Sequence, residues 1–268
     1  MKKILLAVDG DHFPDGAFDF AQKMNEQEPI LLTGVFLPEL DLATSLSYTA
    51  AFVPLVETYA AEALEKSIAT FQQQCRRYGI DFKVHNTLPS FGLPDLQKES
   101  RFADLLLLGH EKFYGDLSIY GTNEFLGGAL HQAECPVVVI PEQFSFPKSV
   151  ILSYDGSSSA AYAIKSFTYL FPQFCNRRTI LVYSSATEKE MPEMEKIKEL
   201  ASQHFSNLEF QLLSADPKKY FGTWLSEIKH PIVVSGAYGR TGLSRIFKHS
   251  FVYEIMHEHN VPVYIAHR

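Results

Sequence analysis

The residues best suited to chemistry lie in a glycine-rich stretch in the last quarter of the chain. This stretch, residues 231–250, reads PIVVSGAYGRTGLSRIFKHS. An apolar run at its start predicts a buried strand that ends at Gly236, and Gly239 follows after two residues. Glycines let backbone N–H groups approach an anion, and a helix after the loop adds its positive dipole end. A strand followed by such a loop and a helix is therefore a favourable place to bind phosphate, and His249 and Ser250 follow nine residues after Gly239.

The polar neighbours of this loop have two interpretations each. Ser250 is either a phosphate ligand or a solvated or capping hydroxyl in an ordinary strand-to-helix loop. His249 either blocks the pocket with its side chain or brings partial positive charge to phosphate oxygens, because histidine is ionisable near neutral pH. Three basic residues could screen a polyphosphate, although such residues are more often solvated loop charges: Arg240, Arg245 and Lys248.

Two other groups of residues could suggest a catalytic nucleophile or a metal site, but a structural role explains each of them better. Ser157 to Ser159 follow Asp155-Gly156 and precede an alanine-rich segment, which predicts a helix N-cap rather than a nucleophile. His257 and His259 flank Glu258, but residues two apart on a helix point about 200° apart. A metal site at these histidines is therefore not expected.

The elements that must position these residues occur twice along the chain. KSVILSYDG, starting at Lys148, repeats KKILLAVDG, starting at Lys2, and Val261-Pro262-Val263 repeats Cys135-Pro136-Val137. Such repetition indicates a duplication. We expect one domain over residues 1–144 and a second over residues 145–268, joined by a short segment bounded by prolines.

Each half alternates apolar runs with segments of helical periodicity. This rhythm is typical of an α/β fold, a doubly wound parallel sheet covered by helices on both faces. A long helix is expected from Leu55 to Gly79, and residues 37–54 before it read as an insertion. The predicted strands are 4–8, 29–36, 82–85, 104–108 and 136–140, then 148–155, 179–183, 208–212, 232–235 and 263–266.

Composition excludes several classes of protein. A net charge of −7 argues against nucleic acid or an anionic membrane surface as the main partner. The three cysteines are too scattered for a disulfide framework or a metal site and read as reduced packing residues: Cys75, Cys135 and Cys175.

The short apolar run at the start does not fit a signal peptide, so a cytoplasmic protein is expected. Enzyme motifs such as a nucleophile elbow or a Walker lysine are not recognisable, which leaves at most a weak ATPase.

The glycine-rich stretch and the repeated strand ending in Asp-Gly resemble the universal stress protein family in its tandem form. That family's nucleotide loop has a glycine, two residues, a second glycine, nine residues, and then glycine with serine or threonine. Here His249 stands at the third glycine. The resemblance implies two five-stranded parallel sheets with about four helices each. It also implies a pseudo-dimer within one chain, in which residues 137–140 face residues 263–266.

The resemblance also implies a site for an adenine nucleotide, ATP, ADP or AMP, in the second half. Asp155 would lie at the base-binding end of the first strand, and Val182 would offer backbone groups to adenine. Gly236 would lie by the ribose, with Gly239 and Ser250 around the phosphates and His249 beside them.

The first half departs from the pattern, because Lys112 replaces the second glycine and Gly121-Thr122 is out of register. It is expected to be structural. The resulting prediction is a stress-response or signalling protein with one nucleotide site per chain. Two alternatives stay open: an interaction protein whose altered loops are docking surfaces, and a binder of another small ligand in the same crevice.

Overall fold

A computed structural model describes residues 1–9, 12–37, 53–86, 93–109, 124–184, 190–213, 217–236 and 259–266 of the chain. By its internal contacts the chain divides into two compact units, Met1–Cys135 and Pro136–Arg268. The predicted division at residue 144 stays a prediction. Within the described residues, no helix has both the length and the apolar character that a membrane crossing requires.

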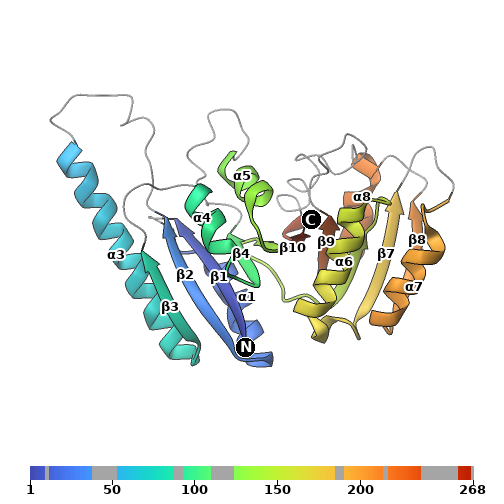
Figure 1. The fold of residues 1–268 in the computed structure, drawn as a ribbon, viewed down its shortest axis with the longest axis horizontal. Helices are drawn as coiled ribbons and strands as arrows, with labels where there is room; N and C mark the ends of the chain where they lie inside the picture. The colour runs from blue at the N-terminus through green and yellow to red at the C-terminus, as the bar shows by residue number, and fades with distance from the viewer. Residues whose placement is uncertain are drawn as a thin grey trace. The chain divides into compact units, whose positions relative to one another are not determined.

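The first unit is built on four parallel strands in the order β3-β2-β1-β4. Their carboxyl ends meet at one edge, and Figure 1 shows the arrowheads of β1 and β2 there. Strand β4 is buried along its whole length, as expected for a run of four leucines covered on both faces. The strands are β1 (Lys2–Asp9), β2 (Ile30–Leu37), β3 (Asp81–Asn86) and β4 (Leu105–Gly109).

Helices cover both faces of these strands. Phe18 of α1 meets Phe71 of α3 edge-on, with 6.5 Å between ring centroids, and Phe71 also contacts Phe36 of β2. The chain returns from β3 to β4 through α4, and a right-handed crossover places this helix on the opposite face. Gly79 ends α3 with a φ of +63°, as predicted for a helix C-terminus. The helices are α1 (Asp15–Gln27), α3 (Val53–Tyr78), α4 (Leu93–Ser100) and α5 (Glu124–Gln132).

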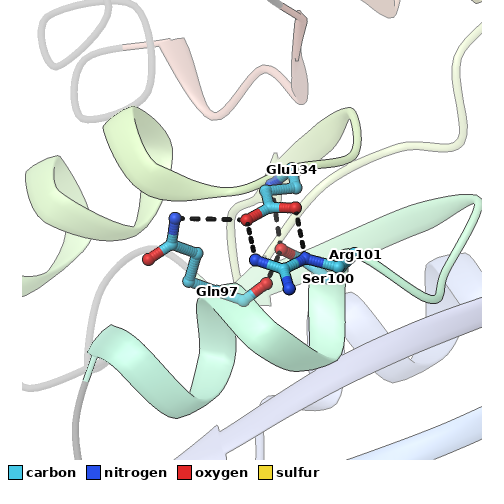
Figure 2. Close-up of polar contacts among 4 residues, drawn as sticks. All are labelled: Gln97, Ser100, Arg101 and Glu134. Carbon is cyan, nitrogen blue, oxygen red and sulfur yellow. Dashed lines mark hydrogen bonds and ion pairs between the residues drawn. The ribbon is translucent and has the colours of Figure 1, made fainter.

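A polar cluster fixes the end of α4 to the segment that follows α5 (Figure 2). The buried Ser100 Oγ accepts a hydrogen bond from the backbone N–H of Glu134 at 2.9 Å and donates one to the Gln97 carbonyl at 2.7 Å. Arg101 forms a bidentate pair with the Glu134 carboxylate, with two N–O distances of 2.7 Å. This guanidinium lowers the pKa of Glu134.

The second unit repeats the arrangement with five parallel strands in the order β10-β9-β6-β7-β8. The strands are β6 (Ser149–Ser153), β7 (Arg178–Ser184), β8 (Leu208–Leu213), β9 (Pro231–Gly236) and β10 (Val263–Ala266). The helices are α6 (Ser158–Leu170), a short 3-10 helix (Pro172–Phe174), α7 (Met194–His204) and α8 (Pro217–Ser226).

Strand β5 (Val137–Ile140) pairs antiparallel with β10 in this second unit. Val139 lies opposite Val263, and Val137 lies opposite Ile265. This confirms the predicted pairing of the two apolar strands. Both strands are fully buried, and the pairing covers an edge that would otherwise expose unpaired backbone groups.

An aromatic cluster anchors β10 to α6. Tyr264 of β10 is fully buried, and its ring lies 5.2 Å from Phe167 and 5.9 Å from Phe171, edge-on to both. Its hydroxyl forms a 2.8 Å hydrogen bond with the Ser166 hydroxyl. The phenol is thus buried with its polar atom satisfied, as such residues require.

Every predicted strand overlaps an observed strand, and the predicted fold class is confirmed. Residues 38–52, most of the predicted insertion, lie outside the described residues. Strands β3 and β8, at the two ends of the strand order, are the exceptions to burial, because the described positions along each are only partly buried or exposed.

We expect Tyr264→Phe to lower the free energy of unfolding by about 1 kcal/mol, because it removes one buried hydrogen bond and keeps the ring. Tyr264→Ala should cost about 3–5 kcal/mol through lost packing. Urea denaturation measures both. Ser166→Ala combined with Tyr264→Phe should cost less than the sum of the single changes, and strict additivity would contradict a shared hydrogen bond.

The burial of the cysteines leads to a second prediction, which concerns the reactivity of their thiols. Burial raises the pKa of Cys75 and Cys135 to about 12, so on the order of one thiol in 10⁴ is ionised at pH 8. Cys175 is only partly buried, and burial raises its pKa as well. A disulfide reagent at pH 8 should modify Cys175 first, and Cys175→Ser should remove the fastest phase. Fast modification of Cys75 or Cys135 in the native protein would contradict their burial.

Candidate ligand-binding edge of the second unit

The candidate site lies where the strand order of the second unit reverses. The chain leaves the central strand β6 toward β7 on one side, and later returns to β9 on the other side. Ligands of open α/β sheets bind at the carboxyl ends of the strands at such a switch point. Asp155 follows β6, and Gly236 is the last residue of β9, so both predicted residues lie at this edge.

The turn after β6 holds the Asp155 side chain in place. Asp155 is partly buried, and its Oδ1 accepts a hydrogen bond from the Ser157 N–H at 2.9 Å. Gly156 between them has a φ of +81°, which favours glycine. Within the described part of the chain, Oδ2 of Asp155 receives no hydrogen bond.

Ser157 is the N-cap of α6, as predicted. Its hydroxyl accepts a hydrogen bond from the Ala160 N–H at 3.1 Å, and its carbonyl accepts one from Ala161. The first turn of α6 carries no acidic residue. The positive end of this helix dipole is thus not compensated by a carboxylate of its own first turn.

Gly236 is required by packing at this edge. A Cβ atom at this position would lie 2.4 Å from the Ala160 nitrogen and 2.6 Å from the Ser159 carbonyl carbon. Both are backbone atoms of the first turn of α6, which cannot move aside as a side-chain tip could. The end of β9 therefore contacts the N-terminus of α6 directly, close to the Asp155 turn.

Val182 lies inside β7 rather than at its end. It is buried, pairs with Ser153 on one side and Gln211 on the other, and its carbonyl accepts the Tyr154 N–H at 3.0 Å. This hydrogen bond occupies one lone pair of the Val182 carbonyl, one of the backbone groups that the resemblance assigns to adenine. The adenine-binding role of Val182 stays a prediction.

The segment before α7 covers the Asp155 turn, which sequence reasoning missed. A Cβ on Gly156 would lie 2.9 Å from the Pro192 Cβ, so the two residues are in close contact. Glu193 next to it has a φ of +48°. Burial, and then the carboxylates of Glu193 and Asp155, raise the pKa of the Tyr154 phenol. No local signal joins these segments, because the contact forms only through the fold.

Three predicted site residues lie outside the described residues, namely Gly239, His249 and Ser250. The same holds for other residues that the sequence analysis weighed: Arg240, Arg245, Lys248, His257 and Glu258. His259 is described, and its Nδ1 lies 3.3 Å from the Ser226 hydroxyl. In the part of the chain that the structure describes, no three His, Cys, Asp or Glu side chains gather as a metal site would require.

The matching edge of the first unit differs in its helix N-terminus. Asp9 ends β1 and Gly109 ends β4, so the strand ends correspond. Helix α1, however, begins after Pro14, which makes no capping hydrogen bond, and Asp15 lies in its first turn. The negative charge of the Asp15 carboxylate would repel an anion bound at this helix N-terminus. Lys112, Gly121 and Thr122 lie outside the described residues.

These features define a tandem α/β protein whose second unit holds a candidate site at the sheet's switch point. No protein-family model matches the chain, and no curated protein matches it either. Among solved structures, a universal stress protein from Archaeoglobus fulgidus matches with 16% identity and a TM-score of 0.75, covering 100% of this chain and 96% of that one. The chain thus has the universal stress protein fold in its tandem form.

Two further solved structures are similar over different lengths. A protein from Pseudomonas aeruginosa described as a putative universal stress protein has 15% identity and a TM-score of 0.55, covering 100% of this chain and 93% of that one. A family protein from Arabidopsis thaliana with AMP bound has 16% identity, covers 53% of this chain and 93% of that one, and has a TM-score of 0.34. That score is too low to transfer its ligand to this chain.

We expect Gly236→Ala to lower the free energy of unfolding by about 1–3 kcal/mol, because the new methyl group meets backbone atoms of α6. Gly128→Ala in α5 is the matched control. There a Cβ would meet the Leu93 side-chain tip at 2.3 Å, which can rotate away, and alanine also favours the helix. Urea denaturation compares the two variants, and equal effects would contradict the close contact of β9 with α6.

Proposed function

We propose that the chain is a cytoplasmic stress-response or signalling protein that binds an adenine nucleotide, ATP, ADP or AMP, at the switch-point edge of its second unit. The observation that carries this proposal is the meeting of Asp155, Gly236 and the N-terminus of α6 at one edge. A carboxylate suits the hydroxyl and amino donors of a nucleoside, and a helix N-terminus suits its phosphates.

The roles divide between the strand ends and the loop after β9. Asp155 Oδ2 accepts a hydrogen bond from the nucleoside, while Oδ1 stays on the Ser157 N–H. Gly236 brings the ligand close to the backbone, since it carries no side chain in the crowded space beside Ala160. Gly239 and Ser250 surround the phosphates in this proposal, and His249 adds a ring N–H beside them.

The contrast between the two units supports one site per chain. Both units bring an aspartate and a glycine to the ends of neighbouring parallel strands. The helices that follow these aspartates differ. Helix α1 carries a carboxylate in its first turn, and helix α6 does not. An anionic ligand would meet Asp15 in the first turn of α1, whereas the first turn of α6 carries no carboxylate.

The test is a thermal shift of nucleotide-stripped protein with ATP and with AMP. A ligand that binds the native state stabilises it by about 2.7 kcal/mol at one hundred times its Kd, so Tm should rise with concentration. Asp155→Asn should reduce this rise, because asparagine can still accept the Ser157 N–H while its amide nitrogen cannot accept from the ligand. Equilibrium dialysis with the same nucleotides measures binding directly.

Asp9→Asn is the matched control, because Asp9 has the corresponding place at the end of β1. It should leave the nucleotide-dependent rise in Tm unchanged. A wild-type protein whose Tm does not move at millimolar ATP or AMP, with no binding in dialysis, would overturn the proposal and favour an interaction protein. Equal loss in both variants would contradict a single site in the second unit.

A further inference from the structure

A second candidate site lies at the opposite edge of the second unit, where strands β9 and β10 begin. A cavity of about 680 Å³ opens there. Its walls are the turn after α8, the segment that enters β10, and residues 143–145 after β5. Strand β9 has six residues, so at about 3.3 Å per residue roughly 16 Å separates this cavity from Gly236. The cavity is therefore distinct from the nucleotide edge.

Hydrogen bonds to neighbouring strands hold the cavity walls in place. The Lys229 carbonyl accepts from the Ser149 hydroxyl at 3.0 Å, and the His230 carbonyl accepts from the Lys148 N–H at 2.8 Å. On the other wall, the Pro262 carbonyl accepts from the Val233 N–H at 3.0 Å. Both walls are thus tied to the sheet, which makes the cavity preformed rather than dependent on a ligand.

The lining combines cationic and hydrogen-bonding groups with apolar surface. Lys229 supplies a full positive charge, while His230 and Asn260 supply side-chain hydrogen-bond donors. Leu225, Ile228 and Val261 add apolar surface. Among the described lining residues there is no aspartate or glutamate. Three acidic residues are adjacent in sequence to lining residues: Glu142, Glu227 and Glu258, of which Glu258 lies outside the described residues.

The ring of His259 packs against one face of α8. Its Nδ1 lies 3.3 Å from the Ser226 hydroxyl, which itself donates to the Gly222 carbonyl at 3.0 Å. A Cβ on Gly222 would lie 2.7 Å from His259 Nε2, so the ring packs directly on α8. The ring therefore forms a rigid part of the wall.

We propose that this cavity binds a small organic anion, a carboxylate or phosphate monoester with a compact apolar body. Lys229 pairs with the anionic group, and His230 and Asn260 donate hydrogen bonds to it. The apolar walls contact the body of the ligand. The volume falls in the range of about 300–1,000 Å³ that is usual for small-molecule sites, and the lining exposes more polar than apolar surface, which suits a charged ligand.

The experiment titrates ¹⁵N-labelled full-length protein with benzoate and with phenyl phosphate, and follows the backbone amide signals of Lys229, His259 and Asn260. Saturable shifts at these positions are expected. Benzyl alcohol, which has the same ring without the charge, should bind at least about tenfold more weakly, because it cannot pair with Lys229. Inorganic phosphate alone should also bind more weakly, since it lacks the apolar body.

Lys229→Met should weaken benzoate binding by about tenfold and leave benzyl alcohol unaffected, because methionine keeps the apolar stem without the charge. Lys198→Met, an exposed lysine of α7 outside the cavity, is the matched control and should change neither. Ser145→Trp, at an exposed position of the lining, should obstruct both probes while leaving the urea midpoint unchanged.

Three outcomes would overturn the proposal: no saturable shift at these amides with about 10 mM benzoate or phenyl phosphate, equal affinity for benzyl alcohol, or no effect of Lys229→Met. Asp155→Asn should not alter benzoate binding. Binding of benzoate and binding of nucleotide are therefore tested separately. A protein that does not bind nucleotide could still bind benzoate in this cavity.

Discussion

Helix α6 lies so close to the end of β9 that Gly236 has no room for a side chain. This contact determines the geometry of the second unit's candidate site. It brings the end of β9 to the first turn of α6, which directly follows the Asp155 turn. At the other end of the helix, Ser166 and Phe167 hold Tyr264 of β10. One helix thus orients two strands and places its N-terminus at the ligand edge.

The two units show how one fold can keep its layout while its sites diverge. In both units the strand order reverses beside the first strand, which ends at Asp9 in β1 and is followed by Asp155 after β6, and a glycine ends the neighbouring strand. The difference lies in the first turn of the following helix. Ser157 caps α6, whereas Pro14 precedes α1 and Asp15 carries a charge there. These changes alter the electrostatics of the edge, while the corresponding strands pair in parallel in both units.

Opposite edges of a parallel sheet offer different chemistry. At the carboxyl ends, helix N-termini and turn glycines present backbone N–H groups, which suits phosphates. At the amino ends of β9 and β10, the walls are built instead from side chains such as Lys229 and Asn260. Specificity there depends on individual residues, so the two proposed sites of the second unit can bind different ligands independently.

The fold class, the duplication and the approximate position of every described strand could be predicted from the amino-acid sequence. This was possible because strands buried on both faces are continuous apolar runs, as in Leu105–Leu108, and because the Ser157 cap is a local hydrogen bond. Only the tertiary structure showed that Pro192 covers Gly156, that the Val182 carbonyl is already bonded, and that a cavity lies beside Lys229. These features join segments far apart in the chain, and crossover connections rather than local patterns bring such segments together.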